Sequence, residues 1–503
     1  MKDNKKGAKN STNDFAKNQG KDTETSSIEN IRANIKKNFL KSNRISLDAE
    51  NLLNEIIKLI QPINFRKKVN LPKEDDKLQK KHYLVTTIEE IINIANKNGF
   101  SLCRSNSNIY IYNSEFWESV TDESFTDFLG LAALKLGIDK YESKHYKFKE
   151  ELYKQFLSAG GLKSMSISKG TTLINLKNGT FEVSENMTAL RKFKKEDFIK
   201  YQLPFSYNEN AKSPLFQSFL NKVLPEKELQ DILAEYLGSI FIKNDVLKLE
   251  KCLLLYGSGA NGKSVFYEIV MALLGSENTT NYTLSSLTQD NSKSRINIEY
   301  KLLNYASEID GKLKSDIFKS MVSGEPLPVQ VLYKQDRVIT EYAKLLFNCN
   351  ELPKEVENTN AFFRRFIIIP FNVTIPEADQ DKKLSNKIIK SELSGVFNWM
   401  LNGLERLLKQ NDFTSSEIAE KEVLNYQKYS DSVLTFMEDE NYIVSTTENY
   451  TLKNLYNEYK VYCIDSGMRC CSKKTFSTRL KKNNFEVIRK SYGISVYVEK
   501  KVF

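Results

Sequence analysis

The chain has 503 residues and a formal net charge of +10, and 40% of its residues are hydrophobic while 27% are charged. These values are typical of a soluble globular protein with roughly three or four domains. No run of about 18 apolar residues is present, so the sequence predicts no membrane-spanning helix. The polar, lysine-rich start of the chain does not resemble a secretory signal.

The cysteine and histidine content limits the kinds of metal site, disulfide and catalytic site that the sequence predicts. The six cysteines are scattered and form no CxxC pair, so neither a zinc ribbon nor a disulfide framework is predicted, and a reduced cytoplasmic environment is expected. His82 and His145 are the only histidines in the sequence, which disfavours histidine catalysis and histidine metal sites. The positive charge suits a polyanionic partner, although lysine-rich proteins also carry such an excess for solubility alone.

The first part of the chain is predicted to be a tail followed by an α/β accessory domain. Residues 1–45 are polar and lysine-rich, a composition typical of a disordered basic segment. Residues 46–205 contain a strand-like run at 109–112 and two short strands joined by Asn178 and Gly179, a favoured hairpin turn. Residues 206–248 have apolar side chains at helical spacing and predict helices.

A glycine-rich loop between an apolar strand at 252–256 and a helical pattern at 265–274 is the strongest motif. It matches GxxxxGK[ST], a loop that binds the phosphates of a nucleotide, through Gly257, Ser258, Gly259, Ala260, Asn261, Gly262, Lys263 and Ser264. Backbone amides of such a loop and the helix that follows it attract phosphate. Lys263 is expected to reach the β- and γ-phosphates and Ser264 to offer an oxygen to Mg²⁺. We therefore predict ATP and Mg²⁺ as cofactors, although kinases, GTPases, transporters and helicases share this loop.

Acidic residues follow the next apolar strand, at 302–306. A carboxylate at the carboxyl end of a strand beside the glycine-rich loop can hold Mg²⁺ through water and polarise the attacking water. We predict this role for Glu308, with Asp310 as the reserve candidate because strand alternation directs it to the same side. The alternative is that both are solvated loop residues.

A hairpin with a basic, aromatic-flanked tip is predicted next. Strands at 329–333 and 338–340 flank a polar turn at 334–337, and Tyr333, Lys334 and Arg337 lie at or beside that tip. A solvated turn is the alternative interpretation.

Two further polar positions adjoin predicted strands. Asn350 ends an apolar strand at 344–349 and is suited to contact the γ-phosphate or the attacking water. Arg364 and Arg365 directly precede an apolar strand at 366–371, and a guanidinium can stabilise charge that develops on a transferred phosphoryl group. A surface salt bridge or a nucleic-acid contact is the alternative for the arginines.

The last segment, residues 431–503, is predicted to be a small domain after a linker at 411–430. Helical patterns at 431–440 and 452–466 precede a basic helix at 472–482 and a hairpin near its end. The basic helix carries Lys473, Lys474 and Arg479. This order resembles a winged helix, so we expect the basic helix to contact duplex DNA. A protein-binding winged helix or a solvated basic face is the alternative.

Taken in order, these motifs resemble superfamily 3 helicases, in particular the helicase part of phage, plasmid and poxvirus primase–helicase proteins. Superfamily 3 helicases often have two adjacent acids at the second motif, whereas this chain has Ser307 before Glu308, as many phage-type members do. The resemblance covers roughly residues 100 to 410. It rests on the glycine-rich loop, Ser307 and Glu308, the stretch from Ser323, Gly324, Glu325 and Pro326 to Tyr333 and Lys334, Asn350 with Pro353, and Phe363, Arg364 and Arg365 before Pro370 and Phe371. Upstream, the segments 175–179 and 203–205 look like the domain that precedes the motor in this family.

The resemblance implies an α/β protein with an AAA+-like P-loop ATPase core at 249–410, a helical collar at 206–248 and a C-terminal winged helix. It implies a homo-hexameric ring with ATP sites between subunits, in which Lys263, Ser264, Glu308 and Asn350 act within one subunit. Arg364 or Arg365 would act on the neighbouring subunit's nucleotide, and we favour Arg365. The hairpin with Tyr333, Lys334 and Arg337 would grip one DNA strand in the central pore, since lysine and aromatic contacts tolerate any sequence.

The predicted function is therefore an ATP-dependent DNA helicase for replication of a phage or mobile genetic element, with single-stranded and duplex DNA and other replication proteins as partners. Primase activity is not expected, because the region before residue 200 shows no clear metal-binding acidic cluster. An AAA+ initiator or helicase loader, which remodels DNA without processive unwinding, is the alternative. A P-loop kinase or signalling NTPase is a third hypothesis, disfavoured by the basic hairpin tip, the paired arginines and the winged-helix-like C-terminal segment.

Overall fold

The chain, described as a computed structural model, divides into two compact units, which we call the N-terminal unit and the main unit. The N-terminal unit comprises residues up to 113 together with 118–162, and the main unit comprises 114–117 and everything from 163 onward. The structure describes residues 49–71, 77–105, 108–160, 171–184, 187–307, 309, 313–330, 336–353, 357–491 and 493–501.

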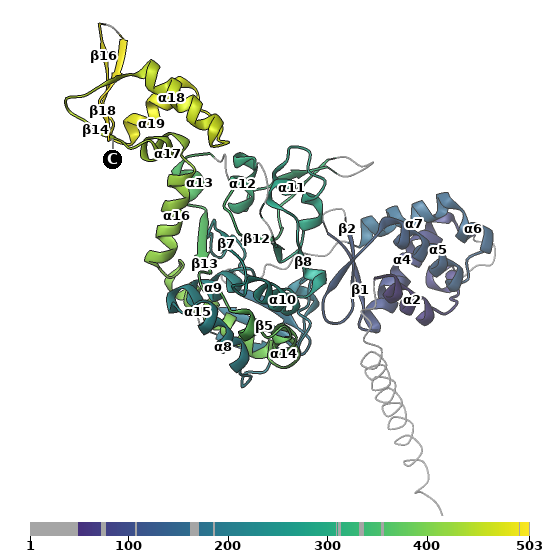
Figure 1. Cartoon of the computed structure of the whole chain (residues 1–503). Coiled ribbons are helices and arrows are strands. Elements are labelled where there is room, and N and C mark those ends of the chain that lie inside the picture. Colours follow the sequence, from purple (N-terminus) through teal and green to yellow (C-terminus); the bar gives the residue numbers. More distant parts are fainter. Residues whose placement is uncertain are drawn as a thin grey trace, which may run out of the picture. The chain divides into compact units, whose positions relative to one another are not determined.

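The N-terminal unit is a helical cluster with a small antiparallel sheet (Figure 1). Ile56, Phe125 and Phe156 are among its fully buried core side chains. Thr121 caps α5 (Asp122–Leu136), and Gly137, at φ 103°, ends this helix in the left-handed conformation. Its elements are α2 (Ala49–Leu59), α3 (Phe65–Lys68), α4 (Lys80–Lys97), β1 (Ser101–Ser105), β2 (Asn108–Tyr112), β3 (Trp117–Val120), α5 (Asp122–Leu136), α6 (Lys140–Lys144) and α7 (Tyr146–Ala159).

A five-stranded parallel sheet forms the centre of the main unit, in the order β13-β7-β12-β9-β8. Its strands are nearly all apolar because helices and loops cover both faces. Side chains alternate between those faces, so Leu253 and Leu255 join one core while Cys252 and Leu254 join the other. The strands are β7 (Cys252–Tyr256), β8 (Thr279–Thr280), β9 (Leu303–Ala306), β12 (Lys344–Cys349) and β13 (Phe366–Pro370).

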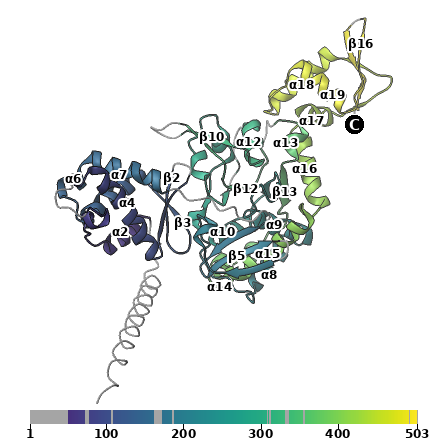
Figure 2. The same ribbon diagram turned by 180° about the vertical axis from the view of Figure 1, so that it is seen from behind.

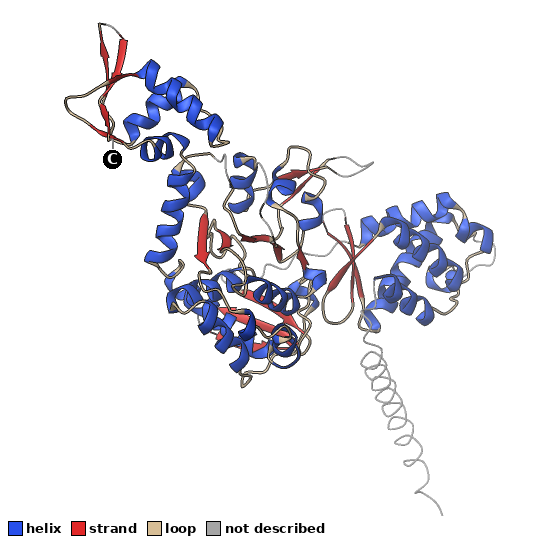
Figure 3. Ribbon diagram, in the orientation of Figure 1, coloured by secondary structure: helices blue, strands red, loops and turns tan. Residues whose placement is uncertain are grey.

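Different helices supply the two cores that sandwich this sheet (Figure 3). The first core holds α8 (Pro214–Val223), α9 (Lys227–Ser239), α10 (Lys263–Leu274), α14 (Leu384–Ser391) and α15 (Leu393–Gln410). The second holds α11 (Leu284–Thr288), α12 (Ser315–Val322), α13 (Asn360–Phe363) and α16 (Glu417–Tyr429), with the hairpin of β10 (Leu327–Val329) and β11 (Arg337–Ile339).

Helices α9 and α15 pack backbone to backbone. A Cβ on Gly403 would lie 2.4 Å from the carbonyl carbon of Ala234, so only glycine allows this approach. Beside it the fully buried carboxylate of Glu235 accepts hydrogen bonds from Arg406 Nε at 2.5 Å and from the backbone and hydroxyl of Thr414. The predicted helices at 206–248 are therefore present as α8 and α9, held by α15.

The boundary between the units differs from the predicted one at residue 205. The predicted hairpin is present as β4 (Thr172–Leu176) and β5 (Gly179–Ser184), which continue into β6 (Met187–Arg191). Phe181 of β5 lies 6.1 Å, ring to ring, from Phe397 of α15, and the labels of Figure 2 show β5 grouped with α8, α14 and α15. This sheet belongs to the main unit because its apolar face shares that unit's core.

Residues 411–430, predicted to be a linker, contain α16. Tyr426 of α16 packs 5.2 Å from Phe363 and 5.8 Å from Phe366, ring to ring, and its hydroxyl donates to the carbonyl of Pro353 at 3.0 Å. The helix thus covers β13, which explains why this segment is ordered in structure although its sequence is mostly polar.

The C-terminal segment has its own core, built around Phe436, Tyr459 and Phe476. The predicted helices are present as α17 (Ser432–Asp439), α18 (Leu452–Asp465) and α19 (Lys473–Lys482), and the predicted hairpin as β16 (Val487–Lys490) and β17 (Gly493–Val496). Three short strands complete it: β14 (Tyr442–Val444), β15 (Tyr450–Thr451) and β18 (Val498–Lys500).

Within the described ranges, no helix is both long enough and apolar enough to cross a membrane.

Candidate functional site

The glycine-rich loop follows β7, at the point where the strand order of the sheet changes direction. The strands that follow β7 in the sequence, β8, β9 and β12, lie on one side of it, whereas β13 lies on the other side. Ligands of open parallel sheets bind at such a point, outside the carboxyl ends of the strands. Both neighbouring strands hold the loop: Gly257 N–H donates to Cys349 O at 3.1 Å, and Phe371 N–H donates to Tyr256 O at 2.7 Å.

The loop conformation requires its glycines. Gly259 and Gly262 have φ values of 113° and 86°. A Cβ on Gly257 would lie 2.3 Å from Asn261 Nδ2 and 2.5 Å from Phe371 O, whereas one on Gly259 would meet nothing within 4 Å. The backbone at Gly259 is therefore open on the side where a ligand can approach it closely.

Helix α10 begins at Lys263 with no side chain capping its amides. Such free N–H groups at a helix start favour an anion. Ser264, in the first turn, is exposed, and its hydroxyl is available to a cation bound with that anion.

Lys263 is buried beside neutral oxygen atoms. Its Nζ donates to Gly257 O at 2.6 Å and to Asn261 Oδ1 at 3.1 Å, while Asn261 Nδ2 donates to Phe371 O at 2.9 Å. Burial lowers the pKa of Lys263, and burial raises the pKa of the nearby Cys349 thiol to about 12. The ammonium is thus desolvated beside neutral acceptors, so the loop fits a phosphate that would supply the counter-charge.

The predicted polar positions after β9 and β12 lie at this same edge. Cys349 pairs with Tyr256, which places the exposed Asn350 beside the start of the loop. Ala306 pairs with Phe347, so the exposed Ser307 follows β9 on the same side. Glu308 and Asp310 lie outside the described residues.

The two arginines lie at the opposite edge of the sheet. Arg365 immediately precedes β13, and its carbonyl accepts from Cys252 N–H, at the amino end of β7, at 2.7 Å. The loop begins at the other end of the five-residue β7, roughly 16 Å away at about 3.3 Å per residue. A side chain at this position cannot reach phosphate bound by its own loop without a rearrangement of the sheet.

The arginines differ in their surroundings. The Arg365 side chain is 10% exposed and donates through Nη2 to Ser323 Oγ at 3.0 Å and through Nη1 to Ala361 O. The Arg364 side chain is 60% exposed, and the Nη2 atoms of both arginines lie 3.9 Å from Glu250 Oε2. Arg364 is therefore directed to solvent, whereas Arg365 is bound within its own chain.

The predicted basic hairpin is formed by β10 and β11, with Val329 paired to Arg337. Tyr333 and Lys334 lie outside the described residues. Arg337 forms a two-point ion pair with Glu299. Burial raises the pKa of Glu299, and Arg337 opposes that shift. The guanidinium of Arg337 therefore already has a carboxylate partner.

The basic helix α19 begins at Lys473, and the hydroxyl of the preceding Ser472 caps it by accepting from Thr475 N–H at 3.2 Å. Lys473 and Lys474 are exposed in its first turn. Arg479 instead donates to Asp431 Oδ1 at 3.1 Å, so it ties α19 to the start of α17.

Two long-range contacts made by residues of the predicted motifs have no signal in the sequence. Asn261 bridges the Lys263 amine and the carbonyl of Phe371, and Ser323 anchors Arg365. These partners come from residues 42 to 110 positions apart, so local spacing contains no signal for them. Among the described residues, no cluster of three or more metal-ligating side chains is found.

Fold and site together define a mixed α/β protein with a parallel sheet and a glycine-rich loop at the carboxyl edge of that sheet. Comparison with known proteins adds two family matches. Residues 95–225 match the family described as D5 N terminal like, and residues 255–365 match a family of unknown function, DUF5906.

Viral proteins named as helicases are similar to this chain at low identity. "Putative helicase 121R" of Invertebrate iridescent virus 3 is 23% identical over 374 residues, which cover 65% of this chain and 38% of that protein. "Putative helicase L207/L206" of Acanthamoeba polyphaga mimivirus is 24% identical over 234 residues, covering 44% of this chain and 24% of that protein. The chain thus spans well under half the length of these relatives. With the D5 N terminal-like match, they support a likeness to primase–helicase-type proteins.

Among solved structures, the apo C-terminal region of NrS-1 is 12% identical to this chain. The superposition covers 82% of this chain and 98% of that one, with a TM-score of 0.44.

Proposed function

We propose that this chain is the ATP-dependent motor of a DNA helicase that acts in replication of a phage or mobile genetic element. The observation that carries the proposal is the state of Lys263, a desolvated ammonium beside neutral oxygens in a loop whose backbone is open at Gly259. A triphosphate there would supply the missing negative charge, and Ser264 with Glu308 would hold its Mg²⁺. Bound Mg²⁺ would neutralise charge on the β- and γ-phosphates.

Two polar groups would act on the bound nucleotide within the same subunit. Glu308 would orient and polarise the attacking water, and Asn350 would contact the γ-phosphate from the end of β12. The support for Asn350 is its place one residue beyond Cys349, which pairs with the end of β7.

The position of the arginines supports assembly into a homo-hexameric ring. Because they lie at the amino edge of the sheet, a guanidinium from this pair would act on a nucleotide held by a neighbouring subunit. We favour Arg364 for that role over Arg365, in reverse of the preference drawn from the sequence, because Arg364 is exposed and Arg365 is tied to Ser323.

DNA contacts are proposed at two places. The hairpin tip with Tyr333 and Lys334 would hold one strand without reading its sequence. Lys473 and Lys474 at the start of α19 would contact duplex DNA in a winged-helix manner. Arg337 and Arg479 are weaker candidates than the sequence indicated, because each already binds a carboxylate of its own chain.

A forked duplex with one labelled strand tests the function. The purified chain should hydrolyse ATP faster when DNA is added and should displace the labelled strand, and particle images with ATP and DNA should show rings. An initiator or loader would hydrolyse ATP but leave the fork paired. A chain that stays monomeric with both ligands and still hydrolyses ATP at full rate would refute the ring.

A further inference from the structure

A cavity open to solvent lies in the main unit, at the edge of the sheet away from the glycine-rich loop. This cavity has a volume of about 510 Å³, within the range of small-molecule sites. Lys251 and Leu302, which immediately precede β7 and β9, and Lys344, which begins β12, line it. The segments 197–201, 240–245 and 340–345 form the rest of its main walls.

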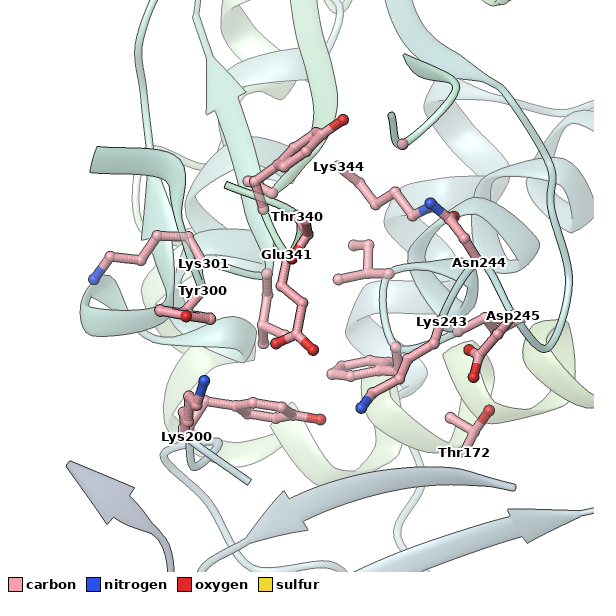
Figure 4. Close-up of a pocket in the computed structure, with 18 of the residues that line it drawn as sticks. Thr172, Lys200, Lys243, Asn244, Asp245, Tyr300, Lys301, Thr340, Glu341 and Lys344 are labelled. Carbon is pink, nitrogen blue, oxygen red and sulfur yellow. The ribbon is translucent and has the colours of Figure 1, made fainter. Parts of the chain in front are cut away.

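Amine groups of several lysines lie around the cavity. Figure 4 shows the amines of Lys200 and Lys243 and the carboxylate of Glu341 directed toward the same space. Lys344 Nζ donates to Asn244 Oδ1 at 3.3 Å, and burial lowers the pKa of Lys344. The cavity is lined by five lysines and three carboxylates, so positive side chains are in excess; the lysines are Lys200, Lys243, Lys251, Lys301 and Lys344, and the acids are Asp197, Asp245 and Glu341.

Two aromatic residues whose backbone is strained form another part of the wall. Tyr300 and Phe198 have φ values of 58° and 48°, a region that bulky side chains rarely adopt. Lys200 Nζ lies 3.5 Å from the centre of the Tyr300 ring and 4.9 Å from that of Phe198. Strain of this kind persists where the surrounding structure requires it, and it clusters at functional sites.

We propose that this cavity binds a nucleotide unit, that is, a nucleobase together with its phosphate, separately from the glycine-rich loop. Lys200 and Lys243 would bind the phosphate oxygens. The Tyr300 ring would stack on the base through the face that Lys200 does not cover, and the Glu341 carboxylate would accept a hydrogen bond from an amino group of adenine or cytosine. The mixture of lysine, aromatic and carboxylate side chains fits this ligand better than it fits a simple anion.

One segment of the cavity wall is continuous in the chain with the hairpin. Residues 340–343 join β11 to β12 and line the cavity at the same time. A bound nucleotide unit would therefore contact the segment that carries the hairpin, and a free mononucleotide or one residue of a single strand could each supply it.

The test uses the full chain carrying Lys263→Ala, so that the glycine-rich loop no longer contributes to binding. Radiolabelled AMP and a fluorescein-labelled oligodeoxyadenylate are titrated against this parent, against Lys200→Ala and against Lys243→Ala. Each lysine variant should bind at least one probe about tenfold more weakly, the loss expected for one charge-assisted contact. The matched control is Lys301→Ala, which removes the same charge from the cavity wall; its amine points away from the cavity and donates to the carbonyl of Glu277 (Figure 4).

Tyr300→Asn separates the ligand contact from folding. Asparagine tolerates positive φ, so this variant should keep or raise the melting temperature while it loses affinity for the probe.

Competition identifies the source of the nucleotide unit. If AMP displaces the oligonucleotide, the cavity takes free nucleotides. If only the oligonucleotide binds, and Lys200→Ala or Lys243→Ala weakens that binding, the ligand of the cavity is a single strand. The proposal fails if neither probe binds the parent, or if Lys200→Ala and Lys243→Ala bind as tightly as Lys301→Ala. These outcomes do not depend on ATP hydrolysis, so they are distinct from a failure of the proposed motor function.

Discussion

Arg365 donates from Nη2 to Ser323 Oγ at 3.0 Å and so joins the start of β13 to the end of α12. Its neighbour Arg364 makes no such contact and extends into solvent, 3.9 Å from Glu250 at its nearest approach. The two adjacent arginines thus have different surroundings. We therefore expect Arg365 to stabilise the fold and Arg364 to act on a nucleotide.

Removal of the lysine in the glycine-rich loop should eliminate hydrolysis without damage to the fold. Lys263→Ala should reduce ATP turnover by about 10³-fold, because the amine would no longer stabilise charge on the transferred phosphoryl group. Its melting temperature should be unchanged or higher, since a buried ammonium beside neutral oxygens is lost. Steady-state ATPase assays and thermal melts measure both quantities, and retained turnover would refute the nucleotide assignment.

The two arginine variants should fail in different ways. Arg365→Ala should lower the free energy of unfolding by about 1–3 kcal/mol, because the hydrogen bonds to Ser323 and Ala361 are lost from a buried site. Arg364→Ala should keep its stability and ATP binding but lose about 10³-fold in hydrolysis.

Mixing variants tests whether Arg364 acts between subunits. Subunits with Arg364→Ala and subunits with Lys263→Ala should recover part of the ATPase activity when mixed, because some interfaces then combine an intact loop with an intact arginine. No recovery on mixing, together with full activity of Arg364→Ala alone, would remove Arg364 from the mechanism.

The contact between α9 and α15 should tolerate no larger side chain. Gly403→Ala would place a methyl group 2.4 Å from the backbone of Ala234, and we expect it to destabilise the chain by about 1–3 kcal/mol. Asn402→Ala, at an exposed position one residue earlier on the same helix, is the control and should leave the urea midpoint unchanged. Equal midpoints for both variants would contradict the close helix approach.

Acid should weaken the ion pairs around Glu250. A hydrogen bond from Lys248 holds the pKa of Glu250 below its ordinary value of 4.5. A depressed carboxyl pKa contributes stability above the unfolded value and loses it as pH falls through the folded value. Glu250→Gln should therefore be less stable than the parent at neutral pH, by under about 1 kcal/mol because the pair is partly exposed. The difference should vanish well below pH 4.5, and a constant difference at all pH values would exclude this carboxylate as its cause.

The sequence by itself determined the glycine-rich loop between its strand and helix, the polar residue after β12 and the order of helices in the C-terminal segment. These features are local: contiguous residues set the turn, the caps and the apolar periodicity, so nearby residue types are sufficient to predict them.

Only the tertiary structure decided which charged side chains are available to bind a ligand, and at which edge of the sheet each predicted site residue lies. Arg337 and Arg479 are of a residue type that contacts nucleic acid, yet each is bound by a carboxylate of its own chain. Glu299, 38 positions away, binds Arg337, and Asp431, 48 positions away, binds Arg479. Likewise β4 to β6 join the main core through Phe181 and Phe397. Such pairings depend on how distant segments pack together, and a linear pattern of residue types does not encode that packing in any local window.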